Sequence, residues 1–175
     1  MLVQLYNTVK EETGLIIEIG CWEGKSTIHL ANTCYPEVLI CNDTWLGNLA
    51  EEQIGGEPHI TTHILKHRDV YQVFINNMNQ FTKSNYKVVK EDCLEWLKTV
   101  NEPIKFCHID ASHDYHSVKK TIDLVRPHMV KKGIICGDDY FCDFAQLDGG
   151  VQRAVNEAFT DFKVVGNKLW YWINE

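Results

Sequence analysis

The sequence predicts an α/β fold, in which a seven-stranded and mostly parallel sheet carries helices on both faces and ends in an antiparallel hairpin. Apolar runs rich in Val and Ile alternate with stretches that have the helical spacing of apolar residues, which is the pattern of a parallel sheet covered by helices. Near the C-terminal end, Gly166-Asn167 separates two β-rich segments, and such a pair favours a two-residue hairpin turn.

Five apolar runs predict the parallel strands, and each of them ends in glycine or an acidic residue. They are LIIEIG (15–20), VLICND (38–43), YKVVKED (86–92), IKFCHID (104–110) and GIICGDD (133–139). In an open parallel sheet, the carboxyl ends of the strands line the crevice where ligands bind. The acidic residues at these ends therefore indicate a binding site.

Helical patterns fill the intervals between the strands and complete a Rossmann-like arrangement. The pair Arg126-Pro127 is expected to end or kink the last helix before the fifth strand, because the residue before a proline avoids the helical region. A short helix is expected at the N-terminus. The other predicted helices cover residues 25–33, 69–81, 94–100, 117–130 and 149–159.

The connection over residues 44–68 does not fit the alternation of strands and helices. A connection this long is usually a lid or a binding loop, and we assign it to the mouth of the substrate site. His59, His63 and His67 are spaced four apart there, which invites a zinc interpretation. We favour a histidine face that is solvated or turned to the substrate, because Pro58 interrupts the segment.

Composition excludes several classes of function. The chain has 175 residues, and its 17 Lys and Arg against 24 Asp and Glu give a formal net charge of −7, which disfavours binding to nucleic acid or to an anionic membrane. No apolar run reaches about 18 residues, and the N-terminus lacks the pattern of a signal peptide. The seven cysteines are scattered without a CxxC pair, which favours reduced thiols. We therefore expect a single cytoplasmic domain over residues 1–175, with a homo-oligomer left open.

Gly20 and Gly24 lie in the turn between the first strand and the following helix. Gly20 permits a tight turn, and Gly24 lets a ligand approach the helix start, where free N–H groups favour an anion. Ser26 is placed to cap this helix or to touch the ligand. The pattern is neither the GxGxxG of dinucleotide-binding folds nor a phosphate-binding P-loop, which needs glycine where Ile19 stands. Dinucleotide chemistry and ATP hydrolysis are therefore disfavoured.

Acids at the next two strand ends suit an adenosine ligand. Asp43 ends the second strand about 20 residues after Gly24, a position from which a carboxylate accepts hydrogen bonds from both ribose hydroxyls. Asp92 ends the third strand, and with the N–H of Cys93 it is placed to meet the adenine edge. The alternatives are that Asp43 caps the following turn and that Asp92 is the N-cap of the next helix.

A second constellation follows the fourth and fifth strands. Asp110 and His113 follow the fourth strand, and Asp138 and Asp139 follow the fifth. Three carboxylates gathered in one crevice repel each other unless a cation joins them, and oxygen ligands of this kind suit Mg²⁺, Mn²⁺ or Ca²⁺. The alternative is that these acids cap turns and that His113 caps the next helix.

Five motifs in order resemble those of class I S-adenosylmethionine-dependent methyltransferases along essentially the whole chain. They are IIEIGCWEGKST, CNDTW, KEDC, FCHIDASHDYHSV and KKGIICGDDY. Within that class, the Asp-Asp-Tyr motif at 138–140 looks most like the small group that includes macrocin-type and other metal-dependent sugar O-methyltransferases. Lys25 departs from the small residue common at its position, which bears on the geometry of the loop rather than on the fold.

The resemblance implies S-adenosylmethionine as the cofactor. In the resembled enzymes, the aspartates matching Asp110, Asp138 and Asp139 hold a divalent metal such as Mg²⁺, and a histidine placed like His113 is the proposed general base. Asp110 is then expected to take part in catalysis as well. The implied cofactor-binding residues are Glu18, Gly20, Cys21, Trp22, Gly24, Ser26, Asp43, Thr44, Trp45, Asp92, Cys93 and Asp110.

The expected reaction is transfer of a methyl group to an oxygen of a small polar acceptor, such as a sugar. Methyl transfer from a sulfonium is already downhill, so the protein has to align the groups and remove one proton from the acceptor. The expected partner is this small molecule, with no nucleic acid and no membrane. Two alternatives stay open, an NAD-dependent oxidoreductase on a related fold and a non-catalytic protein that binds S-adenosylmethionine.

Overall fold

The computed structural model describes residues 1–55, 60–141, 148–166 and 168–175. Within these residues, seven strands form one sheet in the order β3-β2-β1-β4-β5-β7-β6. Strands β1 to β5 pair in parallel, and β7 runs antiparallel to both β5 and β6. The predicted fold class is confirmed. The strands are β1 (Leu15–Ile19), β2 (Leu39–Asn42), β3 (Tyr86–Val89), β4 (Ile104–Ile109), β5 (Met129–Gly137), β6 (Phe162–Val165) and β7 (Leu169–Ile173).

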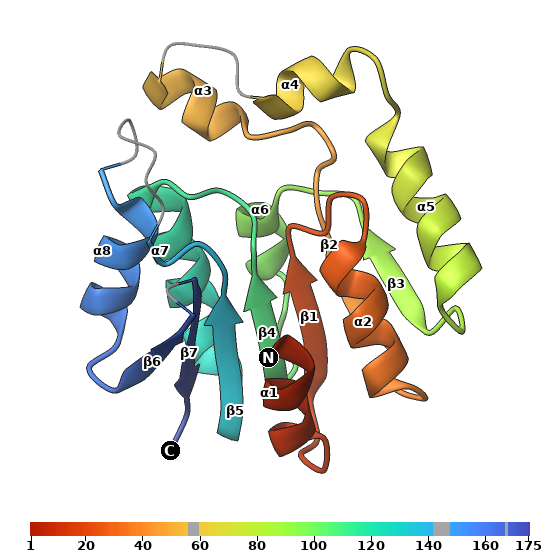
Figure 1. The fold of residues 1–175 in the computed structure, drawn as a ribbon. Coiled ribbons are helices and arrows are strands. Elements are labelled where there is room, and N and C mark those ends of the chain that lie inside the picture. Colours follow the sequence, from red (N-terminus) through yellow and green to blue (C-terminus); the bar gives the residue numbers. More distant parts are fainter. Residues whose placement is uncertain (56–59, 142–147, 167) are drawn as a thin grey trace.

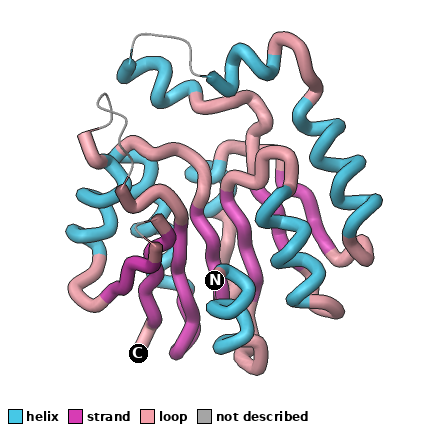
Figure 2. The backbone as a smooth tube through the Cα atoms, in the orientation of Figure 1, coloured by secondary structure: helices cyan, strands magenta, loops and turns pink. Residues whose placement is uncertain are grey.

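Helices cover both faces of the sheet (Figures 1 and 2). Because side chains alternate along a strand, Ile16 of β1 belongs to the core of one face and Ile17 to the core of the other. The first face packs against α1 (Leu2–Val9), α2 (Lys25–Cys34) and α5 (Val70–Phe81), and the second against α6 (Cys93–Leu97), α7 (Tyr115–Val125) and α8 (Gly150–Ala158).

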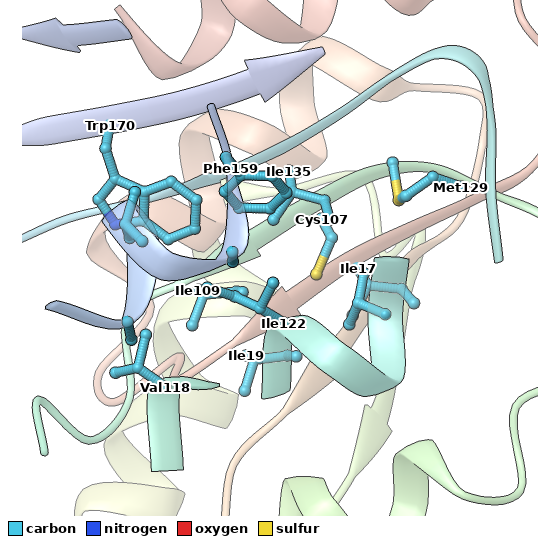
Figure 3. Packing of buried hydrophobic residues seen from close by; sticks show 14 of the residues in the cluster. Ile17, Ile19, Cys107, Ile109, Val118, Ile122, Met129, Ile135, Phe159 and Trp170 are labelled. Atoms are coloured by element: carbon cyan, nitrogen blue, oxygen red, sulfur yellow. The ribbon is translucent and has the colours of Figure 1, made fainter. Parts of the chain in front are cut away.

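The hydrophobic core fixes the sheet on which the site is built. On the side of α7 and α8, Ile17, Cys107 and Ile135 are 0% exposed. Figure 3 shows these side chains together with Ile122 of α7 and Trp170 of β7, which belong to the same cluster. Truncating a buried aliphatic side chain typically lowers the free energy of unfolding by about 2–5 kcal/mol. This packing therefore contributes strongly to the stability of the sheet whose strand ends carry the site.

One helix is shorter than the sequence predicts. The helix expected over residues 117–130 ends at Val125, and a 3-10 turn, η1 (Arg126–His128), leads directly into β5. Pro127 explains the end, because its ring is incompatible with the interior of a helix. Met129 and Val130 continue the apolar helical spacing in sequence but belong to β5, which therefore begins before the predicted residue 133. The hairpin is present as predicted, although Asn167 of its turn lies outside the described residues.

The connection over residues 44–68 contains two short helices, α3 (Leu49–Gly55) and α4 (Ile60–Leu65). Figure 1 shows both helices beyond the end of the sheet to which the arrowheads of β1 and β4 point. The backbone N–H of Asn48 donates to Oγ1 of Thr61 at 3.2 Å, so the start of α3 is joined to α4. In the part of the chain that the structure describes, no helix is long and apolar enough to cross a membrane.

Candidate functional site

A cavity of about 410 Å³ lies at the carboxyl ends of the parallel strands. Its walls come from the loops after β1 to β4, from one side of α7 and from the first residues of the insertion. This volume falls in the range of pockets that bind small molecules and cofactors. The predicted cofactor residues that line it are Gly20, Trp22, Asp43, Thr44, Asp92, Cys93 and Asp110. Those that lie outside the lining are Glu18, Cys21, Gly24, Ser26 and Trp45.

Two glycines shape the loop after β1. Gly20 has φ +87°, and a Cβ there would lie 2.0 Å from the carbonyl oxygen of Asp110, so only glycine fits between β1 and the loop after β4. Gly24 has φ +89° and is the N-cap of α2, and a Cβ there would lie 3.2 Å from the ring of Phe74. The close approach at Gly24 is therefore made by α5, and the cavity meets this loop at Gly20 and Trp22.

The carboxylate of Asp43 ties two loops together at the cavity wall. Its Oδ2 accepts hydrogen bonds from the N–H of Cys21 at 2.9 Å and of Trp22 at 2.8 Å, and its Oδ1 accepts from the N–H of Trp45 at 2.7 Å. Burial raises the pKa of this carboxyl, and the backbone N–H groups oppose the rise. The turn-capping alternative is thus present in the structure, and Asp43 lines the cavity at the same time.

The residues expected around the adenine fall into two groups. Asp92 is the N-cap of α6, because its Oδ1 accepts from two N–H groups of that helix at 2.9 and 3.2 Å, and it lines the cavity with Cys93. The indole of Trp45 packs on Phe74 with ring centroids 4.9 Å apart, and its Nε1 donates to the carbonyl of Trp22 at 2.7 Å. Trp45 therefore supports the loops from the core, behind the cavity wall.

Glu18 and His108 form a buried pair on the neighbouring strands β1 and β4. Oε1 of Glu18 lies 3.0 Å from Nδ1 of His108, and both side chains are buried. Burial lowers the pKa of His108, but the hydrogen bond and the charge of Glu18 outweigh this effect, so the net shift is upward. Within the described residues, Oε2 of Glu18 has no hydrogen-bond partner. A contact between Glu18 and the cofactor stays a prediction.

Asp110, His113 and Asp139 come together at the edge of the cavity. Each offers one possible ligand atom, and the three atoms lie within 4.8 Å of one another. Nε2 of His113 lies 3.1 Å from Oδ2 of Asp139. Lys168 lies against both acids after β5, because its Nζ is 3.0 Å from Oδ2 of Asp138 and 3.5 Å from Oδ1 of Asp139. The structure thus groups two of the three predicted metal ligands with the predicted general base.

The ring of His113 is held on both sides. Its Nδ1 lies 2.8 Å from Oε1 of Glu51 in α3. Burial lowers the pKa of His113, but Asp139 and Glu51 outweigh burial and raise it to about 10, so the ring carries a proton at neutral pH. The hydrogen bond from His113 is the main cause that lowers the pKa of Asp139. Burial raises the pKa of Asp110, against the opposing charge of His108.

Sequence reasoning missed three residues of this site. Glu51 comes from the insertion, which the sequence assigns to the mouth of the substrate site without singling out this residue, and Lys168 comes from the residues just before β7, which no sequence signal places there. His108 did leave a signal, because it is an ionisable residue within an otherwise apolar strand, two residues before Asp110. Two residues along a strand return to the same face of the sheet, so its side chain is directed to the same side as the acid that follows.

The histidine stripe of the insertion lies apart from this group. His63 belongs to α4 and His67 follows it, and both are exposed. His59 lies outside the described residues. Among the described residues, neither His63 nor His67 belongs to a group of three or more residues that could hold a metal ion.

The sequence profile of a family described as a methyltransferase domain matches residues 17–140. The match covers more than half of the chain and spans the glycine loop, Asp43, Asp110 and His113. The protein therefore belongs to this methyltransferase family.

Several solved structures have a similar fold. The O-methyltransferase NovP superposes with a TM-score of 0.69 and 16% identity over 99% of this chain and 76% of that chain. CalS11, a calicheamicin methyltransferase, superposes with a TM-score of 0.65 and 17% identity over 98% of this chain and 76% of that chain. SMU.1697c from Streptococcus mutans, solved in complex with SAH, superposes with a TM-score of 0.66 and 11% identity over 99% of this chain and 95% of that chain. At these identities the likeness shows the fold alone. Comparison with curated proteins gave no match.

Proposed function

We propose that this chain is an S-adenosylmethionine-dependent methyltransferase that transfers a methyl group to an oxygen of a small polar acceptor. The observation that carries the proposal is the grouping of Asp110, His113 and Asp139 at the edge of a cavity whose wall includes the glycine loop. Family membership supplies the reaction class, and the acid and histidine group supplies a means of handling the proton of the acceptor.

The cavity fits S-adenosylmethionine in size and in charge. Its volume of about 410 Å³ suits a ligand of that size, and Asp43, Asp92 and Asp110 place carboxylates along its wall. A wall of one charge sign attracts a ligand of the opposite sign, here a sulfonium cation. When bound, the cofactor supplies an electrophilic methyl group. The complex of the Streptococcus mutans protein with SAH supports the same ligand class for this fold.

Contacts of the cavity residues suggest their roles. Asp43 holds the loop after β1 through N–H groups, and the same carboxylate is our candidate for the ribose hydroxyls. Asp92 and Cys93 begin α6 at the cavity wall and are our candidates for the adenine edge. Thr44 follows Asp43 in the chain and also lines the cavity. Of the other predicted cofactor residues, Gly20, Trp22 and Asp110 line the cavity, and Cys21, Gly24 and Trp45 shape the loops from outside the lining.

A divalent cation such as Mg²⁺ is the second part of the proposal. Two carboxylates and an imidazole with possible ligand atoms within 4.8 Å of one another fit such an ion. Asp110 and Asp139 are the oxygen ligands we propose, and Asp138, whose carboxylate pairs with Lys168 at 3.0 Å, is a further candidate. When bound, the ion lowers the pKa of an acceptor hydroxyl.

His113 and Asp110 are the candidates for taking the proton of the acceptor. In the arrangement described, His113 already holds a proton, because its pKa is raised to about 10. The hydrogen bond to Asp139 contributes most to that rise, so engaging Asp139 elsewhere lowers the pKa of His113 and lets the ring act as a base. Asp110 is the second candidate, because burial raises the pKa of its carboxyl.

A sugar hydroxyl is the acceptor we favour. The support comes from CalS11, which is described as a TDP-rhamnose 3'-O-methyltransferase. The net charge of −7 disfavours nucleic acid and membrane partners. We include a cytoplasmic location in the proposal, since the six described cysteines are free thiols. Cys142 lies outside the described residues.

Calorimetric titration separates this proposal from an oxidoreductase. We expect S-adenosylhomocysteine to bind and NAD to give no heat of binding. The variant Asp43→Ala should weaken S-adenosylhomocysteine binding by roughly tenfold or more, because its carboxylate orders the loop after β1. Lys98→Ala, a change at an exposed helix end away from the cavity lining, serves as the control. Binding of NAD without S-adenosylhomocysteine would overturn the proposal.

Chelation tests the metal. We expect methyl transfer to stop in excess EDTA and to return when magnesium is added, because the acceptor hydroxyl keeps a high pKa without the ion. The readout is formation of S-adenosylhomocysteine. Full activity in EDTA would remove the metal from the proposal and leave the methyltransferase assignment unaffected.

A further inference from the structure

Glu51 is a buried carboxylate that the insertion contributes to the site. Its side chain is 4% exposed, and its Oε1 lies 2.8 Å from Nδ1 of His113. The same oxygen accepts hydrogen bonds from the backbone N–H of His113 at 2.7 Å and from Nδ2 of Asn48 at 3.1 Å. A carboxylate this deeply buried is costly unless it is paired and hydrogen-bonded. These three contacts meet that requirement.

The contact decides how the ring of His113 is oriented. Nδ1 is engaged by Glu51, and Nε2 lies 3.1 Å from Asp139, so the ring is held between α3 and the end of β5. Rotation of the ring would break both contacts. The insertion therefore sets the direction in which Nε2 points, toward the group formed with Asp139 and Asp110.

A second attachment of the insertion is weaker. Arg68 lies 2.9 Å from the carboxylate of Glu23, beside the glycine loop, and its side chain is 51% exposed. Exposed ion pairs typically contribute about 0–1 kcal/mol, because water screens them and long side chains lose entropy. Of these two attachments within the described residues, the buried contact at Glu51 is the stronger, and it joins α3 to the site.

We propose that Glu51 is a positioning residue for the methyl-transfer reaction. With α3 packed over the cavity, Glu51 holds the ring of His113 in the orientation that keeps Nε2 next to Asp139. This inference rests on the proposed function. A carboxylate on one ring nitrogen of a histidine fixes the tautomer and the orientation of the ring and leaves the other nitrogen for the reacting groups. When Asp139 engages another partner, the contact with Glu51 keeps the ring of His113 in the same orientation.

The test compares Glu51→Ala and Glu51→Gln with the control Glu52→Gln. Glu52 is the next residue of α3, and its carboxylate accepts a hydrogen bond from the hydroxyl of Thr62 in α4. The control therefore removes the same charge from the same helix turn and disturbs the insertion without touching the Glu51 contact. Glu51→Gln keeps the shape of the side chain in case Glu51→Ala fails to fold, and circular dichroism checks all three variants.

Hydrogen exchange of the His113 backbone amide is the primary readout, measured by NMR on protein saturated with S-adenosylhomocysteine. Glu51→Ala should speed this exchange by roughly tenfold, since the amide loses its acceptor, and Glu51→Gln should speed it by a smaller factor. The ring nitrogen resonances of His113, identified by their absence from His113→Gln, should shift in both variants. Glu52→Gln should leave the amide and the ring resonances as in the wild type.

Two outcomes are kept apart by this design. If the wild-type chain binds no S-adenosylhomocysteine in calorimetry, the proposed function fails, and the inference fails with it. If the wild type binds but the Glu51 variants match Glu52→Gln in amide exchange and ring resonances, the inference alone is overturned. In assays of methyl transfer, Glu51→Gln should lower kcat and leave the KM for S-adenosylmethionine unchanged, and a raised KM at full kcat would equally contradict positioning.

Discussion

Ionisable side chains at the carboxyl ends of the strands control one another through short contacts. The Glu18 and His108 pair is joined at 3.0 Å, and the His113 and Asp139 pair at 3.1 Å. These groups are partly or fully buried, where salt and water screen charges less than at the surface. Such pairing couples protonation to folding, so the pH dependence of the free energy of unfolding reports on these contacts.

Replacing His113 with Gln should change how stability depends on pH. The pKa of His113 is raised from 6.5 to about 10 in the folded protein, so its contribution is complete below about pH 6.5 and is lost as pH rises through about 10. The pKa of Asp139 is lowered from 3.8, so its contribution is complete above about pH 4 and is lost as pH falls through the lowered value.

Urea unfolding of the wild type and of His113→Gln measures this effect. The difference in unfolding free energy should be largest between about pH 4 and about pH 6.5 and should shrink toward about pH 10. A difference that stays constant over this range would show that His113 is not held by its carboxylate partners.

The sequence predicted the acids at the strand ends but not the residues of other segments that contact this site. Asp43, Asp92 and Asp110 follow buried apolar runs, and topology alone brings such residues to one edge of the sheet. Glu51 reaches His113, and Lys168 reaches Asp138 and Asp139, only through tertiary contacts, which no local pattern encodes. For the same reason the sequence did not reveal that Lys168 pairs with both Asp138 and Asp139.

At the scale of elements, the strands were easier to predict than the connections. Buried parallel strands are continuous apolar runs, and β1 and β4 begin at the residues the sequence predicts. Helices α3 and α4 span seven and six residues, too short to be stable without tertiary contacts, so their sequences carry little signal. Arg126-Pro127 predicted the end of α7, but no sequence pattern predicted that β5 begins as early as Met129.

Lys105 joins three elements at the opposite end of the sheet. It is 0% exposed, and its Nζ donates to the carbonyls of Lys10 at 3.1 Å and Glu12 at 2.9 Å and to the carboxylate of Glu37 at 2.7 and 2.8 Å. Lys105→Met should lower the free energy of unfolding by about 2–4 kcal/mol, because it leaves these acceptors without their donor. Urea unfolding measures the loss.

Lys98→Met is the matched control, because the Lys98 side chain is 56% exposed and pairs with an exposed glutamate. Its effect should stay within about 0.5 kcal/mol. Equal losses in the two variants would mean that the buried ammonium of Lys105 does not hold α1 and β2 to β4.

At the scale of the whole molecule, negative charge gathers at one end of the sheet. The net charge is −7, and the acids that follow β2, β3 and β4 border one cavity. This placement could be predicted because parallel strands end at the same edge. The identity of the acceptor could not be predicted, because the arrangement of α3, α4 and the preceding loop at the cavity depends on contacts such as the one between Glu51 and His113.

Methyl transfer from tritium-labelled S-adenosylmethionine is the measurement that tests the account most directly. The protein is incubated with magnesium and with a panel of sugars and nucleotide sugars, and labelled product is separated and counted. We predict an O-methylated product that depends on the acceptor and is lost in Asp110→Asn. Binding of S-adenosylhomocysteine by the wild type without labelled product from any acceptor would contradict the account and favour a non-catalytic binding protein.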